Sequence, residues 1–267
     1  MESRPSTGRI TSTANPRLKA ALRLRGRRER DREGLTLIDG VRETLRAMEG
    51  GAVLREAFVL PELLLEPDAK ALLERLRAES VPVLEVGRDA FDRLAYGDRL
   101  DGVIAIAETP SHMLADLVLP PEPLVAVIEG VEKPGNLGAV LRTADGAGVD
   151  AVIVAESATD LFNPNIIRAS LGTVFAVPVV VASTGEVLAW LGERGIAIIA
   201  ARVDGSVDYT AADYRGAVAI ALGSEARGLS DAWAELARAS VHVPMLGVAD
   251  SLNVAATAAV LFYEALR

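Results

Sequence analysis

The stretch LVAVIEGVEKPGNLGAVLR, residues 124–142, begins as an unbroken apolar run, continues as a polar turn and ends in a helical pattern. An apolar run without alternation is typical of a strand that is buried on both faces of a parallel sheet. In such sheets, ligands bind at the loops that leave the carboxyl ends of the strands. The stretch therefore predicts a strand, a loop and a helix of an α/β fold, with the polar loop at the ligand-binding edge.

Four further apolar runs follow along the chain, and helical segments separate them. They are AVIVA at 151–155, VPVVV at 177–181, IAIIA at 196–200 and AVAIAL at 217–222. HVPMLG at 242–247 predicts one more strand, which ends near its proline. We therefore predict a doubly wound parallel α/β domain over residues 122–267.

A smaller α/β pattern precedes this sheet. LTLIDG at 35–40 and GVIAIAE at 102–108 are typical of strands, and a helical pattern at 62–80 lies between them. The stretch TPSHMLADLVLPPEP, which begins at residue 109, holds four prolines and has no clear period. We therefore expect a small domain over 1–108, a linker over 109–121 and the sheet domain over 122–267.

Charge is distributed unevenly along the chain. Residues 1–32 carry ten Lys and Arg against three Asp and Glu, a local charge of +7, although the whole chain carries −9. A basic arm on an acidic body is suited to binding the phosphates of a polyanion, and the alternative is a solvated, half-disordered tail. The arm residues that we expect to contact such phosphates are Arg17, Lys19, Arg23, Arg25, Arg27 and Arg28.

Composition excludes several kinds of site. The chain has no cysteine and only two histidines, His112 and His242. Disulfides, thiolate ligands and cysteine nucleophiles are therefore excluded, and we expect no metal site. No apolar run has the length of a signal peptide or a membrane span, so we expect a cytoplasmic protein without a membrane partner.

Three polar loops follow the predicted strands. The first carries Asn136 and Arg142. Its alternative interpretation is purely structural: Asn136 caps a helix, and Arg142 is solvated. The second is GSEARGLS at 223–230, where glycines flank Glu225, and its alternative is an ordinary turn. The third contains Ser251 and Asn253 at the start of a final helix that is apolar on nearly all sides. Such a helix at a chain end suggests that a partner subunit covers it.

A fourth motif fails its structural requirement. GAGVDA at 146–151 fits the dinucleotide-binding pattern G-x-G-x-x-A, but it lies between a predicted helix and a predicted strand. That pattern requires a strand, then the glycines, then a helix. A nicotinamide-binding site is therefore not expected.

Taken in order, NLGAVLR (136–142), GSEARGLS (223–230) and PMLGVADSLNVAATAA (244–259) resemble the three motifs of the SpoU/TrmH family of RNA ribose 2'-O-methyltransferases. LIDGVRETLRAM (37–48) looks like the family's small RNA-recognition domain, and NPNIIRASLGTVFAVPV (163–179) looks like the segment that follows the first motif. Lys133 and Ala255 depart from residues that are frequent in the family. The resemblance covers essentially the whole chain.

This resemblance implies a deep trefoil knot that holds S-adenosylmethionine, and a homodimer with the active site at the subunit interface. The implied catalytic residues are Asn136, Arg142, Glu225, Ser251 and Asn253. The implied cofactor-binding residues are Ala201, Leu222, Gly223, Val243, Met245 and Leu252. Arg168 is expected to contact a second phosphate, and its alternative interpretation is a surface helix arginine.

Two questions stay open at this stage. The family analogy makes Arg142 the activator of the ribose hydroxyl, but a guanidinium is a poor base, so phosphate binding is the alternative. The expected substrate is 23S ribosomal RNA, with transfer RNA as the alternative substrate. A non-catalytic RNA-binding module of the same fold is a further alternative, which the joint presence of all five implied catalytic residues disfavours.

Overall fold

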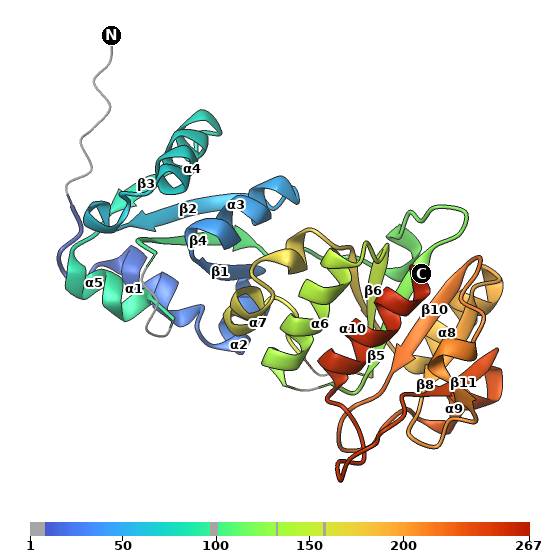
Figure 1. The fold of residues 1–267 in the computed structure, drawn as a ribbon. Helices are drawn as coiled ribbons and strands as arrows, with labels where there is room; N and C mark the ends of the chain where they lie inside the picture. The colour runs from blue at the N-terminus through green and yellow to red at the C-terminus, as the bar shows by residue number, and fades with distance from the viewer. Residues whose placement is uncertain (1–8, 97–100, 132, 157–158) are drawn as a thin grey trace. The chain divides into compact units, whose positions relative to one another are not determined.

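The computed structural model describes residues 9–96, 101–131, 133–156 and 159–267 (Figure 1). It divides into two compact units. The first contains Met1–Pro110 and Asp160–Ala176, and the second contains Ser111–Thr159 and Val177–Arg267. The chain therefore enters the first unit twice.

The first unit is built on a four-stranded sheet in the order β1-β4-β2-β3. Its strands are β1 (Leu35–Asp39), β2 (Leu54–Val59), β3 (Val83–Glu85) and β4 (Val103–Glu108). β4 pairs antiparallel with β1 and with β2, and β2 pairs parallel with β3. The helices before Pro110 are α1 (Pro16–Arg23), α2 (Arg27–Glu33), α3 (Val41–Glu49), α4 (Pro67–Ala78) and α5 (Arg88–Leu94).

The helical pattern expected at 62–80 divides into two elements. A short 3-10 helix, η1 (Pro61–Leu63), is followed by α4, which begins at Pro67. Proline disfavours helical backbone at the residue before it but is tolerated at the first helical position. The predicted helix therefore starts later than the pattern suggested.

The basic arm is ordered from residue 9 onward, so the alternative interpretation of a half-disordered tail is wrong for the described part of the arm. Residues 1–8 lie outside the described residues. α1 packs into the core of the first unit, because its Leu18 and Ala21 and the following Leu24 are buried there, and Arg30 of α2 is buried as well. Burial of these side chains ties the arm to the sheet.

The segment Asp160–Ala176 completes the first unit, whereas the sequence suggested one continuous domain over 122–267. It forms α7 (Pro164–Ala169) and η3 (Thr173–Phe175). Thr36 Oγ1 donates a hydrogen bond to the Phe162 carbonyl at 2.6 Å, and Arg46 Nη1 donates one to the Leu171 carbonyl at 2.7 Å. These bonds fasten the segment to β1 and α3.

The second unit contains a seven-stranded sheet in the order β7-β6-β5-β10-β8-β11-β9, and all its pairings are parallel. The strands are β5 (Leu124–Glu129), β6 (Ala151–Ala155), β7 (Val179–Ala182), β8 (Ala197–Ala201), β9 (Val207–Asp208), β10 (Val218–Leu222) and β11 (Ala239–His242). β6 and β10 are buried along their whole length. The prediction of an α/β fold with a parallel sheet is confirmed.

The helices of this unit are α6 (Pro134–Gly146), α8 (Thr184–Glu193), α9 (Asp231–Leu236) and α10 (Val254–Ala265), with short 3-10 helices η2 (Leu114–Asp116) and η4 (Tyr209–Ala211). α10 packs against α6, and its Ala258, Leu261 and Phe262 are buried. β11 ends at His242, two residues before the proline at which the strand was expected to end. In the described part of the chain, no helix is long and apolar enough to cross a membrane.

Candidate active site

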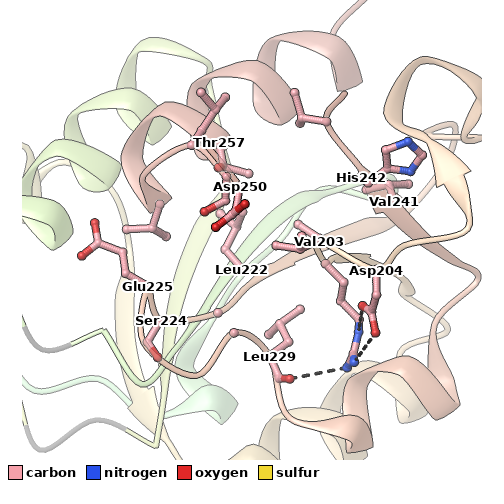
Figure 2. Close-up of a pocket in the computed structure, with 18 of the residues that line it drawn as sticks. Val203, Asp204, Leu222, Ser224, Glu225, Leu229, Val241, His242, Asp250 and Thr257 are labelled. Carbon is pink, nitrogen blue, oxygen red and sulfur yellow. Dashed lines mark hydrogen bonds and ion pairs between the residues drawn. The ribbon is translucent and has the colours of Figure 1, made fainter. Parts of the chain in front are cut away.

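A cavity of about 640 Å³ lies in the second unit, where β8, β10 and β11 end (Figure 2). This is the edge at which ligands bind in parallel α/β sheets. All six expected cofactor-binding residues line the cavity: Ala201, Leu222, Gly223, Val243, Met245 and Leu252. In the view of Figure 2, Leu222 lies centrally, with Glu225 on one side and Asp204 on the other.

Gly223 allows one wall of this cavity to form. A Cβ atom at position 223 would lie 2.0 Å from the carbonyl carbon of Gly228 and 2.2 Å from the amide nitrogen of Leu229. The backbone folds back on itself here, and Ser224 and Gly228 form an antiparallel bridge. Only glycine permits this approach, so backbone groups rather than side chains form this part of the wall.

Glu225 joins the first two polar loops. Its Oε1 accepts a hydrogen bond from Asn136 Nδ2 at 2.8 Å, and its Oε2 accepts one from Lys133 Nζ at 2.9 Å. The Lys133 hydrogen bond is the main reason that the pKa of Glu225 is lowered. Asn136 lies in the first turn of α6 rather than at its cap, so the capping alternative is wrong.

The other expected catalytic residues lie on α6 and before α10. Ser251 lines the cavity, whereas Asn136, Arg142 and Asn253 do not. Arg142 is exposed on α6. Asn253 caps α10, because its Oδ1 accepts a hydrogen bond from the Ala256 amide at 2.8 Å.

A charged cluster on the cavity wall was missed from the sequence. Arg202, directly after β8, donates to Asp204 Oδ1 at 2.8 Å through Nε and to Asp231 Oδ1 at 3.2 Å through Nη1. Its Nη1 also donates to the Leu229 carbonyl at 3.5 Å. The hydrogen bond to Asp204 is the main reason that the pKa of Arg202 is raised. The available signal was the pair of charged residues, Arg202 and Asp204, just after an apolar strand.

The six arm residues expected to contact RNA are all exposed, but they differ in their partners. Ion pairs are formed by Arg17 with Glu56, Arg23 with Glu29 and Arg27 with Asp31. Arg25 donates to the Arg93 carbonyl and lies over the Tyr96 ring. Among the described residues, no carboxylate partner is found for Lys19, Arg25 or Arg28. These three cations can therefore meet a phosphate without leaving a carboxylate of the described chain.

Arg168 on α7 is partly buried rather than a fully solvated surface arginine. Its Nη1 lies 3.8 Å from Asp39 Oδ2, and 28% of its side chain is exposed. Asp39 itself is 5% exposed, and burial raises its pKa to about 6, although the Tyr96 amide and Arg168 oppose this shift. Within the described ranges, no three His, Asp or Glu side chains are grouped as metal ligands would be.

Residues 123–263 match the model of the SpoU rRNA methylase family, and residues 15–105 match that of an MRM3-like substrate binding domain. The chain is 33% identical over 278 residues to the 23S rRNA (uridine(2479)-2'-O)-methyltransferase of Streptomyces viridochromogenes, covering 100% of this chain and 94% of that one. It is 28% identical to the 23S rRNA (guanosine(2553)-2'-O)-methyltransferase RlmP of Bacillus subtilis, covering 96% and 98%.

Solved structures that resemble nearly the whole chain include two methyltransferases. An RNA 2'-O ribose methyltransferase superposes with a TM-score of 0.86 at 43% identity, covering 97% of this chain and 98% of that one. An AdoMet-bound rRNA methyltransferase from Sinorhizobium meliloti superposes with a TM-score of 0.87 at 30% identity, covering 96% of each chain.

Proposed function

Because the chain belongs to the SpoU rRNA methylase family, we propose that it transfers a methyl group from S-adenosylmethionine to a ribose 2'-hydroxyl of 23S ribosomal RNA. The observation that carries this proposal is the cavity at the ends of β8, β10 and β11, beside which Glu225 is bonded to Asn136. The two curated relatives that match nearly the whole chain both act on 23S rRNA. Ribosomal RNA is therefore favoured over transfer RNA.

The cavity fits S-adenosylmethionine in size and chemistry. Its volume of about 640 Å³ lies within the usual range for small-molecule sites, roughly 300–1,000 Å³. Leu222, Met245 and Leu252 offer apolar surface to a base, and the backbone beside Gly223 offers hydrogen-bonding groups. Bound there, the cofactor would supply an activated methyl group on a sulfonium.

The protein's own part in the reaction is alignment. Glu225 holds Asn136 in place across the two loops, and Ser251 presents its hydroxyl at the cavity. Arg142 is exposed, and a guanidinium offers only hydrogen-bond donors and no acceptor for a proton. We therefore assign Arg142 to binding the target phosphate and orienting the ribose, rather than to removing the proton.

We further propose that the chain between β11 and α10 takes part in a deep trefoil knot and that a second copy covers this region. Leu246 and Val248 are fully exposed in that stretch, and Tyr263 of α10 and Leu266, which follows α10, are about half exposed. Large apolar side chains that are exposed on one copy are withdrawn from water when a second copy covers them. A second copy of the chain would shield them and complete the active site.

The N-terminal unit is proposed as the RNA-binding part, with Lys19, Arg25 and Arg28 as its main phosphate contacts. Its match to a substrate binding domain supports this role. With ribosomal RNA as the substrate, we expect the enzyme to act in the cytoplasm.

Calorimetry with S-adenosylmethionine tests the proposal, and one site per subunit is expected in the absence of RNA. Methyl transfer to 23S rRNA and to transfer RNA is then compared, with sedimentation of the same sample to show the dimer. A folded sample that binds no cofactor would refute the proposed function, and transfer to tRNA alone would refute the substrate.

A further inference from the structure

Glu129 ends β5 and is 7% exposed. Its Oε1 accepts hydrogen bonds from Thr184 Oγ1 at 2.7 Å, Trp233 Nε1 at 2.8 Å and Ser230 Oγ at 2.9 Å. Its Oε2 accepts one from the Ser230 backbone amide at 2.7 Å. One buried carboxylate therefore joins β5 to the starts of α8 and α9.

The hydrogen bonds to this carboxylate favour its charged form. Burial alone would raise the pKa of Glu129, but the hydrogen bonds from Ser230, Thr184 and Trp233 outweigh burial and lower it. Hydrogen bonds to a charged group are roughly twice as strong as those between neutral groups. The negative charge is therefore what gives this junction its strength.

Glu129 holds the end of the loop that forms the cavity wall. Ser230 follows Leu229, which lines the cavity and whose carbonyl accepts a hydrogen bond from Arg202. The same loop, Gly223–Ser230, is held near its other end, where Glu225 bonds Asn136 and Lys133. Two carboxylates thus hold one loop, the buried Glu129 at its Ser230 end and Glu225 near its Gly223 end.

We propose that Glu129 is a positioning residue for methyl transfer, which preorganises the Gly223–Ser230 loop for the cofactor by holding Ser230. This proposal rests on the proposed function. Glu129 is not among the residues that line the cavity, so it acts through Ser230 rather than by contact with the cofactor. A loop that is already ordered spares the cofactor the entropic cost of ordering it.

Glu129→Gln tests this role with little change in volume. The glutamine side chain has one acceptor oxygen and one NH2 donor. In one orientation the NH2 group faces the Ser230 backbone amide, and in the other it faces the Ser230 and Thr184 hydroxyls and the Trp233 indole. In both orientations a donor meets a donor, and hydrogen bonds are lost. The Kd for S-adenosylmethionine, measured by calorimetry, should rise about tenfold, equivalent to about 1.4 kcal/mol. In methyl-transfer assays the KM for the cofactor should rise similarly, while kcat at saturating cofactor stays within about threefold, because bound cofactor itself orders the loop.

Thr184→Val is the matched control, because it removes a hydrogen bond to the same carboxylate from α8, which does not line the cavity. It should lower the melting temperature and leave the Kd for the cofactor unchanged. Ser230→Ala keeps the backbone bond and loses the hydroxyl bond, so its Kd should rise about threefold. This variant keeps the test decisive if Glu129→Gln fails to fold.

The wild-type chain separates the two possible failures. If it binds no cofactor, the proposed function fails. If it binds, but Ser230→Ala and a folded Glu129→Gln bind equally well, Glu129 is only structural and the inference is overturned. An equal rise in Kd for Thr184→Val would also overturn it, since that residue does not hold the loop.

Discussion

The six arm cations divide into two groups that make different predictions about RNA binding. Arg17, Arg23 and Arg27 already pair with carboxylates of the same unit, whereas no carboxylate partner is found for Lys19, Arg25 and Arg28 among the described residues. A cation that already pairs with a carboxylate is partly neutralised and has fewer free N–H groups to offer a phosphate. Three substitutions to glutamine neutralise either group. The two triple variants therefore have the same net charge, and they differ only in which cations are removed.

The expected magnitude depends on how many RNA phosphates each group of cations neutralises. Every phosphate that a variant leaves without its cation flattens the slope of log affinity against log salt by roughly 0.7–0.9. Neutralising Lys19, Arg25 and Arg28 should therefore flatten the slope by about 2 to 3. Neutralising Arg17, Arg23 and Arg27 should flatten it by less than about 1, because these arginines are held by internal ion pairs.

The assay is binding of a 23S rRNA fragment across a salt series for the wild type and both triple variants. Cofactor affinity and melting temperature are the controls, and neither should change greatly, because all six side chains are exposed. Deletion of residues 1–32 would be a poor test, since it removes the buried Leu18 and Leu24. Equal salt slopes for the two triple variants would refute the division of the arm cations into two groups. An unchanged slope for the Lys19, Arg25 and Arg28 variant would show that RNA is bound elsewhere.

Arg142→Ala should abolish methyl transfer. Cofactor affinity and melting temperature should stay nearly unchanged, since this side chain is exposed and does not line the cavity. Activity within a few-fold of wild type would contradict the role assigned to Arg142. Asp39→Asn should change the pH dependence of stability. Because burial raises the folded pKa of Asp39 to about 6, its stabilising contribution is present below its ordinary pKa and is lost as pH rises through 6. Urea unfolding from pH 4.5 to 8 should therefore show that the Asn variant gains stability relative to wild type as pH rises, and parallel curves would contradict this.

Much of the sheet could be predicted from sequence because its strands are apolar on both faces. The runs at 124–129 and 151–155 match β5 and β6 residue for residue. The loops that follow β10 and β11 were also recognisable, because polar residues there interrupt otherwise apolar segments. The cavity lined by residues of these loops followed from the rule that ligands bind at the carboxyl ends of parallel strands.

Long-range polar contacts could not be predicted in the same way. Nothing in the local sequence shows that Glu129 meets Ser230 and Trp233, or that Arg202 meets Asp231. The one signal for Glu129 was a charged residue that closes an apolar strand, since a buried charge requires partners. The fold of the basic arm was missed because its arginines conceal the small apolar face of Leu18, Ala21 and Leu24.

The discontinuous first unit constrains the order in which the chain can fold during synthesis. Arg30 of α2 is 3% exposed, and its Nε lies 3.0 Å from Asp160 Oδ2. Asp160 is translated only after β5, α6 and β6. Until then Arg30 has no Asp160 carboxylate to pair with, and burying its unpaired guanidinium would cost several kcal/mol. The first unit therefore cannot reach its final form until β5, α6 and β6 of the second unit have been synthesised.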